Sequence, residues 1–327
     1  MLFSEFPATS MRFWIYLFIS VFCKFAVPVF LAISGALVLS KSHETLKQLW
    51  FKRITKIAFI LVFTSLLYYL YYFAYRLSAF GQLSIADFLV KLYSCQISVY
   101  LWYLYLYISF LIISPLLRLL VKNMENYHFY YIFAIVIFFN FLHPIEYLTS
   151  SGKISMDDNL KILWLGKHGI IFPCLGYFFQ HRLKYEALRK WIPWLWIASV
   201  STIGLSCYLT FHHGQFPGKW IESFHNSFVV FNCAAIFVTT RYLFEKRDLH
   251  VCLRKIVLSI GSCTFGIYLL HMFVENFLIS FSLPYILEMG MDRMICIMFS
   301  CLLILLVSYI ITLITSRLPV IKKLVGF

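Results

Sequence analysis

The chain carries a succession of apolar runs that are long enough, or nearly long enough, to cross a lipid bilayer as helices. A spanning helix needs about 20 mainly apolar residues. Nine segments of the sequence fit this requirement: 13–39, 54–75, 99–117, 129–148, 162–179, 191–211, 224–240, 256–281 and 294–314. We therefore predict an all-α, polytopic integral membrane protein with about nine transmembrane helices.

The composition excludes an ordinary soluble domain. Soluble domains are usually about 25% charged and 45–50% apolar, whereas this chain is 13% charged and 61% hydrophobic. Such a chain has too few charges to cover a surface that faces water. Because the segments between the predicted spans are short, we expect residues 1–327 to form a single membrane domain. Its partner is then the lipid bilayer, and no separate soluble domain is expected.

The net charge of +14 is distributed according to membrane topology. Cations gather in the segments that follow the odd-numbered spans, 41–56, 118–122, 182–190, 241–255 and 317–323, and are fewer in the alternate segments. Since cytoplasmic loops carry an excess of Lys and Arg, the pattern predicts a cytoplasmic C-terminus and an extracytoplasmic Met1. It also argues against nucleic acid as a partner, because DNA-binding proteins present basic residues on a soluble surface.

Most of the cysteines, tyrosines and tryptophans are expected to pack rather than to react. The nine cysteines lie mostly inside apolar runs and form no C-x-x-C pair, so we expect neither a disulfide framework nor a metal site. Tyr and Trp gather near several span ends, as in 68–75 and 191–196. This placement suits the headgroup region of a bilayer, and we expect the tyrosine-rich stripes to face lipid or to pack.

Ionisable residues inside membrane spans are costly, and they usually face a cavity or a partner. The residues of this kind that lie well inside the predicted spans are Lys24, Lys167, His168, His271 and Glu275, and His143 and Glu146 lie near a span end. With the orientation given above, all of them fall in the extracytoplasmic half of the membrane. The sequence therefore predicts a polar cavity that opens outward. For Lys24 and Lys167 the alternative is that they extend to the outer interface instead.

His271 and Glu275 are four residues apart, and this spacing places them on one face of a helix. A carboxylate beside an imidazole stabilises the imidazolium and fixes the tautomer of the neutral ring. The pairing suits a general base, and it also suits a proton relay. A buried pair that serves only packing has the same spacing.

Several strings of residues resemble the acyltransferase 3 family of membrane acyltransferases. Residues 24–35, KFAVPVFLAISG, are similar to that family's R-x-x-V-P-x-F-F-x-x-S-G. Residues 100–105, YLWYLY, and 114–118, SPLLR, resemble H-L-W-F/Y-L and S-P-L-L-R. Residues 264–271, TFGIYLLH, resemble S-x-G-I-Y-L-x-H, and residues 172–177, FPCLGY, give a weaker match. The strings follow one another in the family's order and spacing.

The resemblance implies a multi-pass protein of the bacterial cytoplasmic (inner) membrane, in a family with about ten transmembrane helices. Members use acyl-CoA, commonly acetyl-CoA, as co-substrate and need no bound cofactor. They acylate sugar hydroxyls of surface polysaccharides, lipopolysaccharide, peptidoglycan or lipid-linked precursors. The resemblance therefore implies O-acetylation, or another O-acylation, in polysaccharide biosynthesis.

Acyl transfer of this kind needs a base for the sugar hydroxyl and a group that stabilises the thioester oxyanion. We expect His271 to act as the base with Glu275 as its partner. The expected substrate-binding residues are Lys24, Ser34, Gly35, Trp102, Tyr103, Lys167 and His168. Ser34 and Gly35 are also expected to let backbones approach closely. The expected contacts to the phosphates of acyl-CoA are Arg53, Lys56, Arg254 and Lys255, for which positive-inside bias alone is the alternative.

The chain departs from the family pattern in two places that bear on activity. The family's first helix carries an Arg and, eleven residues later, a His that is taken as the catalytic base. The first span here aligns with the family's second, so this pair is expected to be missing. Tyr100 also stands where the family often has His. The alternatives to an active acyltransferase are an exporter of polysaccharide or lipid-linked sugar and an inactive, N-terminally truncated member of the family.

Overall fold

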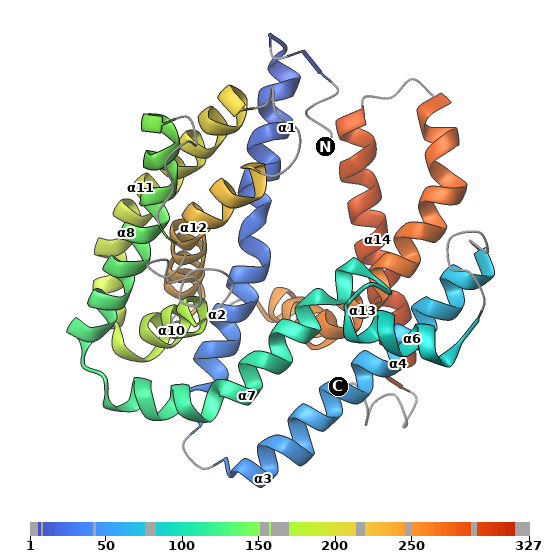
Figure 1. Cartoon of the computed structure of the whole chain (residues 1–327), viewed down its shortest axis with the longest axis horizontal. Helices are drawn as coiled ribbons and strands as arrows, with labels where there is room; N and C mark the ends of the chain where they lie inside the picture. The colour runs from blue at the N-terminus through green and yellow to red at the C-terminus, as the bar shows by residue number, and fades with distance from the viewer. Residues whose placement is uncertain are drawn as a thin grey trace. The chain divides into compact units, whose positions relative to one another are not determined.

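The computed structural model describes residues 6–7, 9–41, 44–75, 83–150, 157, 170–213, 220–245, 250–288 and 293–317. Every regular element in these ranges is a helix (Figure 1), which confirms the all-α prediction. By its internal contacts the chain divides into two compact units. Unit 1 comprises Met1–Leu46 and Ser109–Arg247, and unit 2 comprises Lys47–Ile108 and Asp248–Phe327. A single membrane domain stays a prediction.

The chain is a multi-pass membrane protein. Among the described residues, 6 helical stretches are long and apolar enough to cross a membrane: Met11–Val38, Leu46–Ala74, Val99–Asn123, Tyr185–Phe211, Val251–Leu278 and Ile295–Thr315. Two shorter apolar helices, Asn126–Phe139 and Phe228–Phe244, overlap the fourth and seventh predicted spans. The first part of the fifth predicted span, 162–169, lies outside the described residues. The number of nine spans therefore stays a prediction.

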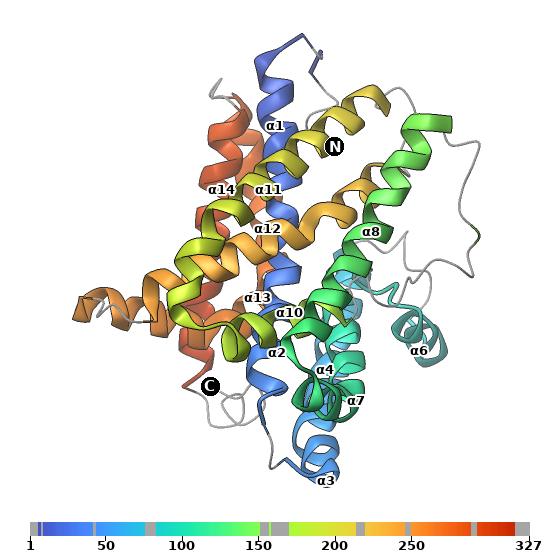
Figure 2. The ribbon, with the colours of Figure 1, turned by 90° about the vertical axis from the view of Figure 1, so that its left-hand side faces the viewer.

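Unit 1 pairs its helices through polar bonds as well as apolar packing. It contains α1 (Met11–Phe22), α2 (Ala26–Val38), the second part of α7 (Trp102–Asn123), α8 (Asn126–Ser150), α10 (Ile171–Tyr177), α11 (Tyr185–His213) and α12 (Trp220–Phe244). α11 and α12 lie side by side (Figure 2). The hydroxyl of Tyr185 donates to the Tyr242 carbonyl (3.0 Å), and Trp196 Nε1 donates to Thr239 Oγ1 (2.9 Å). These two bonds fix an antiparallel pairing.

A short 3₁₀ segment, Cys23–Phe25, interrupts the first span between α1 and α2. Pro28 explains its position, because proline has no N–H to offer the carbonyl four residues earlier, that of Lys24. Asn232 on α12 is buried and stabilises the break. Its Nδ2 donates to the Phe22 carbonyl (3.0 Å), and its Oδ1 accepts from the Ser199 hydroxyl (3.3 Å). Lys24 is exposed at this break.

Two arginines of unit 1 cap the C-terminal ends of neighbouring helices, where backbone carbonyls have no partner within the helix and carry partial negative charge. Arg118 donates from Nε to the carbonyl of Val38, the last residue of α2 (3.0 Å), and forms an ion pair with Glu44. Arg182 acts at the end of α7. Its Nη2 donates, over 2.9 to 3.2 Å, to the carbonyls of Val121, Lys122 and Met124.

Arg241 repeats the arrangement at a third helix end. It donates to the carbonyls of Phe179 and Leu183 at the end of the π-helical segment Phe178–Arg182, and it pairs with Glu245. The three arginines come from segments that the charge pattern assigned to cytoplasmic loops. Some of the cations in these segments therefore stabilise helix ends, in addition to their expected role in membrane topology.

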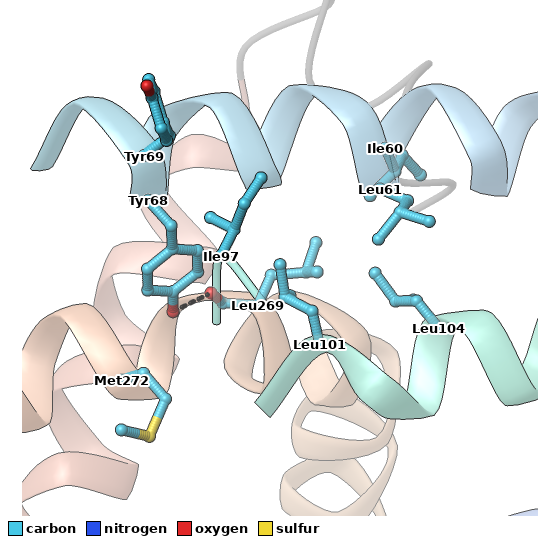
Figure 3. Close-up of a cluster of buried hydrophobic side chains, with 9 residues drawn as sticks. All are labelled: Ile60, Leu61, Tyr68, Tyr69, Ile97, Leu101, Leu104, Leu269 and Met272. Carbon is cyan, nitrogen blue, oxygen red and sulfur yellow. Dashed lines mark hydrogen bonds between the residues drawn. The ribbon is translucent and has the colours of Figure 1, made fainter. Parts of the chain in front are cut away.

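Unit 2 contains α4 (Thr55–Tyr75), α6 (Ile85–Tyr93), the first part of α7, α13 (Val251–Glu288) and α14 (Arg293–Thr315). The short α3 (Leu46–Gln48) and a π-helical segment, Leu49–Ile54, lead into α4. The core lies where α4, α7 and α13 meet (Figure 3). Its buried side chains are Ile60, Leu61, Tyr68, Tyr69, Ile97, Leu101, Leu104, Leu269 and Met272.

The structure of unit 2 decides between two expectations for its tyrosines and adds an element. Tyr68 and Tyr69 were expected to face lipid or to pack, and they pack in the buried core. They are buried because each hydroxyl finds a partner inside the protein, a backbone carbonyl for Tyr68 and a carboxylate for Tyr69. The added element is α6, a helix between the second and third spans that the apolar runs did not predict.

Candidate active site

Two of the segments that resemble motifs of the family, 100–105 and 264–271, are in contact in unit 2. Tyr100 lies on the 3₁₀ turn Val99–Leu101 that opens α7, and Tyr268 lies on α13. The hydroxyl of Tyr268 donates to the backbone carbonyl of Tyr100 (2.7 Å). The ring of Tyr103 meets the ring of Tyr268 edge-on, with centroids 5.6 Å apart. These contacts fix the start of α7 against the middle of α13.

His271 follows one turn after Tyr268 and has a defined ring orientation. Its Nδ1 lies 2.6 Å from the Tyr268 carbonyl oxygen. A carbonyl can only accept a hydrogen bond, so Nδ1 carries the proton and Nε2 of the neutral ring is the acceptor. The ring also lies edge-on to Tyr100, at 6.2 Å between centroids and 83° between planes. His271 is half-buried.

Glu275 is half-buried, one turn beyond His271 on the same helix. Within the described part of unit 2, no hydrogen bond or ion pair connects its carboxylate to the imidazole. In the structure the Tyr268 carbonyl fixes the tautomer of His271, and the role of Glu275 as the partner of His271 stays a prediction. The physical reason is local, because a helical side chain reaches the carbonyl one turn earlier without bringing a second side chain into place.

Tyr68 supports the same stretch of α13 and was not expected to do so. Its hydroxyl donates to the Leu269 carbonyl (3.1 Å; Figure 3), and its ring stacks on Phe273 with centroids 3.8 Å apart. His271 therefore lies between two residues that Tyr68 holds. The signal in the sequence was weak, because Tyr68 belongs to a tyrosine-rich run at a span end.

The expected substrate-binding residues divide between the two units. Trp102 is exposed and Tyr103 is half-buried at the start of α7, beside Tyr268. Lys24, Ser34 and Gly35 belong to unit 1, where Lys24 is exposed, Ser34 is half-buried and Gly35 is buried. Lys167 and His168 lie outside the described residues, as do the side chains of His143 and Glu146.

Gly35 does allow the close backbone approach that was expected of it. A Cβ at Gly35 would lie closer to backbone atoms of Pro173 than the 3.0 Å that real Cβ atoms keep, and a Cβ at Gly176 would meet the backbone of Ala32 in the same way. α2 and α10 therefore cross with their backbones in contact. This crossing joins the first family-like string to the weaker one.

The expected phosphate-binding residues lie at the beginnings of two helices of unit 2. Arg53 and Lys56 flank the start of α4 and are half-buried, whereas Arg254 and Lys255 lie in the first turns of α13 and are exposed. The first turn of a helix presents free N–H groups and favours anions. Arg254 and Lys255 thus add to the positive end of α13. Arg53 and Lys56 instead lie inside a continuous helical stretch, where the N–H of Thr55 is already bonded to the Trp50 carbonyl.

The fold and this site define a multi-pass membrane protein with a histidine held as a proton acceptor. A family model for an acyltransferase domain, that of the acyltransferase 3 family, matches residues 1–313. The chain belongs to this family and is a membrane acyltransferase. No curated protein matches the sequence. No solved structure matches it either.

Proposed function

We propose that the protein is an O-acyltransferase that transfers an acyl group, commonly acetyl, from acyl-CoA to a sugar hydroxyl. The acceptor is a cell-surface polysaccharide or its glycolipid precursor. The observation that carries the proposal is the hydrogen bond from His271 Nδ1 to the Tyr268 carbonyl. It leaves Nε2 as an acceptor for the proton of an incoming hydroxyl.

The proposed reaction begins when Nε2 of His271 removes the proton of the sugar hydroxyl as its oxygen attacks the thioester carbonyl. A carbon–oxygen bond forms and the tetrahedral intermediate collapses. The carbon–sulfur bond then breaks, and the imidazolium returns its proton to the thiolate of coenzyme A. General-base catalysis of this kind contributes about 10²–10⁴ in rate. The acyl donor is consumed as a substrate, and no resident cofactor is needed.

Glu275 is proposed to stabilise the imidazolium rather than the neutral ring. It lies on the same face of α13 one turn away, so it is placed to face the imidazolium that forms when His271 takes the proton of the hydroxyl. This role differs from the fixing of the tautomer, which the Tyr268 carbonyl supports. Glu275 is therefore a positioning residue that acts through His271.

Acyl-CoA is proposed to enter with its phosphates at the beginnings of α4 and α13, near Arg53, Lys56, Arg254 and Lys255. The stretch of α13 from Arg254 to His271 corresponds to about 25 Å at 1.5 Å per residue. The pantetheine arm would run along this stretch and bring the thioester toward His271. The beginnings of both helices lie on the cation-rich side of the chain.

The acceptor sugar is proposed to bind at the other end of the same path. Trp102 and Tyr103 are placed for this role because they share the start of α7 with Tyr100, whose ring meets His271. Lys24, Ser34, Gly35, Lys167 and His168 are proposed as further acceptor residues on the family resemblance alone. The family resemblance favours the bacterial cytoplasmic membrane, and the charge pattern favours a cytoplasmic C-terminus.

The test is acyl transfer by the full chain in lipid nanodiscs, supplied with radiolabelled acetyl-CoA and a panel of cell-surface glycans. We expect label in a glycan with the wild type and a loss of at least about 100-fold in His271→Gln. The matched control is His128→Gln, because His128 Nδ1 only accepts from the Glu125 amide at the start of α8. Undiminished transfer by His271→Gln would remove His271 as the base.

A further inference from the structure

α6 carries its apolar side chains on the outside. The nine-residue helix Ile85–Tyr93 exposes Ile85 by 81%, Leu89 by 55%, Val90 by 65% and Tyr93 by 93%. At 3.6 residues per turn these four positions form one continuous face. Among the side chains of that face, none is charged.

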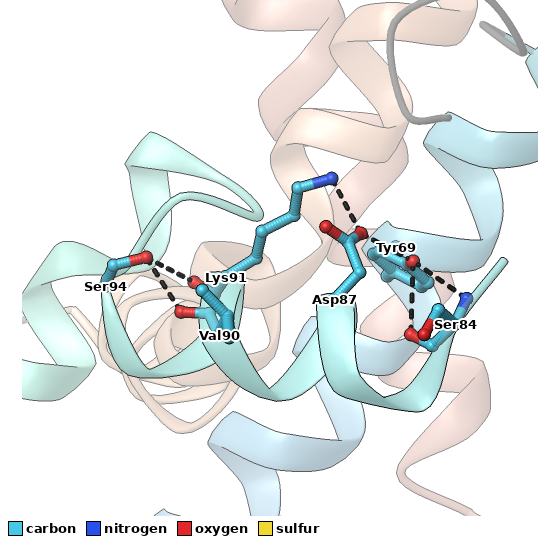
Figure 4. A network of polar contacts seen from close by, with 6 residues as sticks. All are labelled: Tyr69, Ser84, Asp87, Val90, Lys91 and Ser94. Atoms are coloured by element: carbon cyan, nitrogen blue, oxygen red, sulfur yellow. Dashed lines mark hydrogen bonds and ion pairs between the residues drawn. The ribbon is translucent and has the colours of Figure 1, made fainter. Parts of the chain in front are cut away.

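The two charged residues of α6 point the other way. Lys91 forms an ion pair with Asp87 over 2.7 Å, and their side chains are only 21% and 34% exposed. Asp87 also accepts from the hydroxyl of Tyr69 (2.8 Å), which is buried on α4 (Figure 4). The inward side of α6 is thus a neutral, hydrogen-bonded cluster flanked by Phe88 and Leu92, which pack on the core of unit 2.

This orientation of apolar and charged side chains is the reverse of that on a helix exposed to water. A helix at a water-facing surface turns its charges outward and its apolar stripe toward the core. α6 is also too short to span, since nine residues correspond to about 14 Å against a hydrocarbon thickness of about 30 Å. In the sequence it lies between two helices that are long and apolar enough to span, Leu46–Ala74 and Val99–Asn123. Val99, at the start of the next of these helices, is likewise apolar and 73% exposed.

We propose that the outward face of α6 is a lipid-contact surface that lies in the acyl-chain region near the edge of the bilayer. The occupant is lipid hydrocarbon, because the face has apolar side chains and no charge to offer a headgroup or an acidic or basic partner. The Asp87–Lys91–Tyr69 cluster makes this embedding possible by satisfying the polar groups of α6 inside the protein. The inference does not depend on the chemistry proposed for His271.

Photo-crosslinking of the full chain tests this directly. p-Benzoylphenylalanine is placed at Leu89 and at Tyr93, and the protein is reconstituted in nanodiscs of phosphatidylethanolamine and phosphatidylglycerol. A matched lipid-facing control is Leu116, 66% exposed on the span of α7, and a matched polar control is Glu125 in the turn before α8. We expect phospholipid adducts at 89 and 93 in yields similar to those at 116, with few at 125.

Two other outcomes would overturn the inference. Adducts between two copies of the chain would assign the face to self-association, and a lack of lipid adducts at 89 and 93 when 116 reacts would assign it to water. A second measurement is thermal stability in the same nanodiscs. We expect Leu89→Glu to lower the melting temperature by several degrees and Leu89→Met to leave it unchanged. Equal stability of Leu89→Glu and wild type would show that the face is exposed to water.

Discussion

Gly35 on α2 and Pro173 on α10 approach so closely that no Cβ fits between their backbones. The relation is reciprocal, since Gly176 on α10 meets the backbone of Ala32 on α2. Small residues allow such crossings in membranes, where helices associate through close van der Waals packing. Two strings far apart in the sequence are therefore brought together by glycines.

The first prediction concerns this crossing. Gly35→Ala and Gly176→Ala should each push the two backbones apart and destabilise unit 1, by about 1–3 kcal/mol or more from overpacking. The control is Gly204→Ala on α11, because a Cβ at Gly204 meets nothing within 4 Å. It should be neutral or slightly stabilising, since Ala exceeds Gly in helix propensity by about 1 kcal/mol. Thermal unfolding in detergent measures all three, and equal stability of the three variants would contradict the prediction.

The second prediction concerns the capping arginines. Arg182→Gln removes a cation that serves three terminal carbonyls of α7, and hydrogen bonds from charged groups are worth about 1.5–3 kcal/mol. The melting temperature should fall by several degrees. Arg189→Gln is the matched control, because it removes the same charge from an exposed position on α11. If both variants melt alike, the capping bonds contribute nothing beyond the charge.

Some features of the fold and of the candidate site could be predicted from the sequence, and others could not. Apolar runs locate spanning helices because burial in lipid depends on composition and length, so 13–39 and 191–211 agree with Met11–Val38 and Tyr185–Phe211. α6 was missed because its apolar residues are few and lie outside any long run. The sequence also placed Glu275 one helical turn from His271. Spacing along a helix cannot reveal that the imidazole of His271 hydrogen-bonds to the backbone carbonyl of Tyr268.

The third prediction concerns pH. The ammonium of Lys91, and then the hydroxyl of Tyr69, hydrogen-bond to Asp87 and hold the pKa of its carboxyl below the usual 3.8. A lowered pKa in the folded state means that the ionised form stabilises the fold. That stabilisation is complete above the unfolded value, near pH 4, and is lost as the pH falls through the lower folded value. Hydrogen exchange of the α6 amides, corrected for intrinsic rates, should accelerate only in this acid window.

Asp87→Asn is the control for this acid transition. It cannot ionise, so protection of α6 in this variant should be lower at neutral pH and should not change further across the same window. If wild type and variant lose protection in parallel, the transition belongs to another group.

The last prediction separates the positioning of the candidate site from its stability. Tyr268→Phe and Tyr68→Phe each remove one hydroxyl that donates to a backbone carbonyl, that of Tyr100 and that of Leu269. Each should cost about 1 kcal/mol of stability. Only Tyr268→Phe releases the turn that leads to Trp102 and Tyr103, so it should reduce kcat for acyl transfer about tenfold more than Tyr68→Phe does. Steady-state kinetics and thermal unfolding of both variants measure this, and a loss of activity that merely follows stability would make Tyr268 a packing residue.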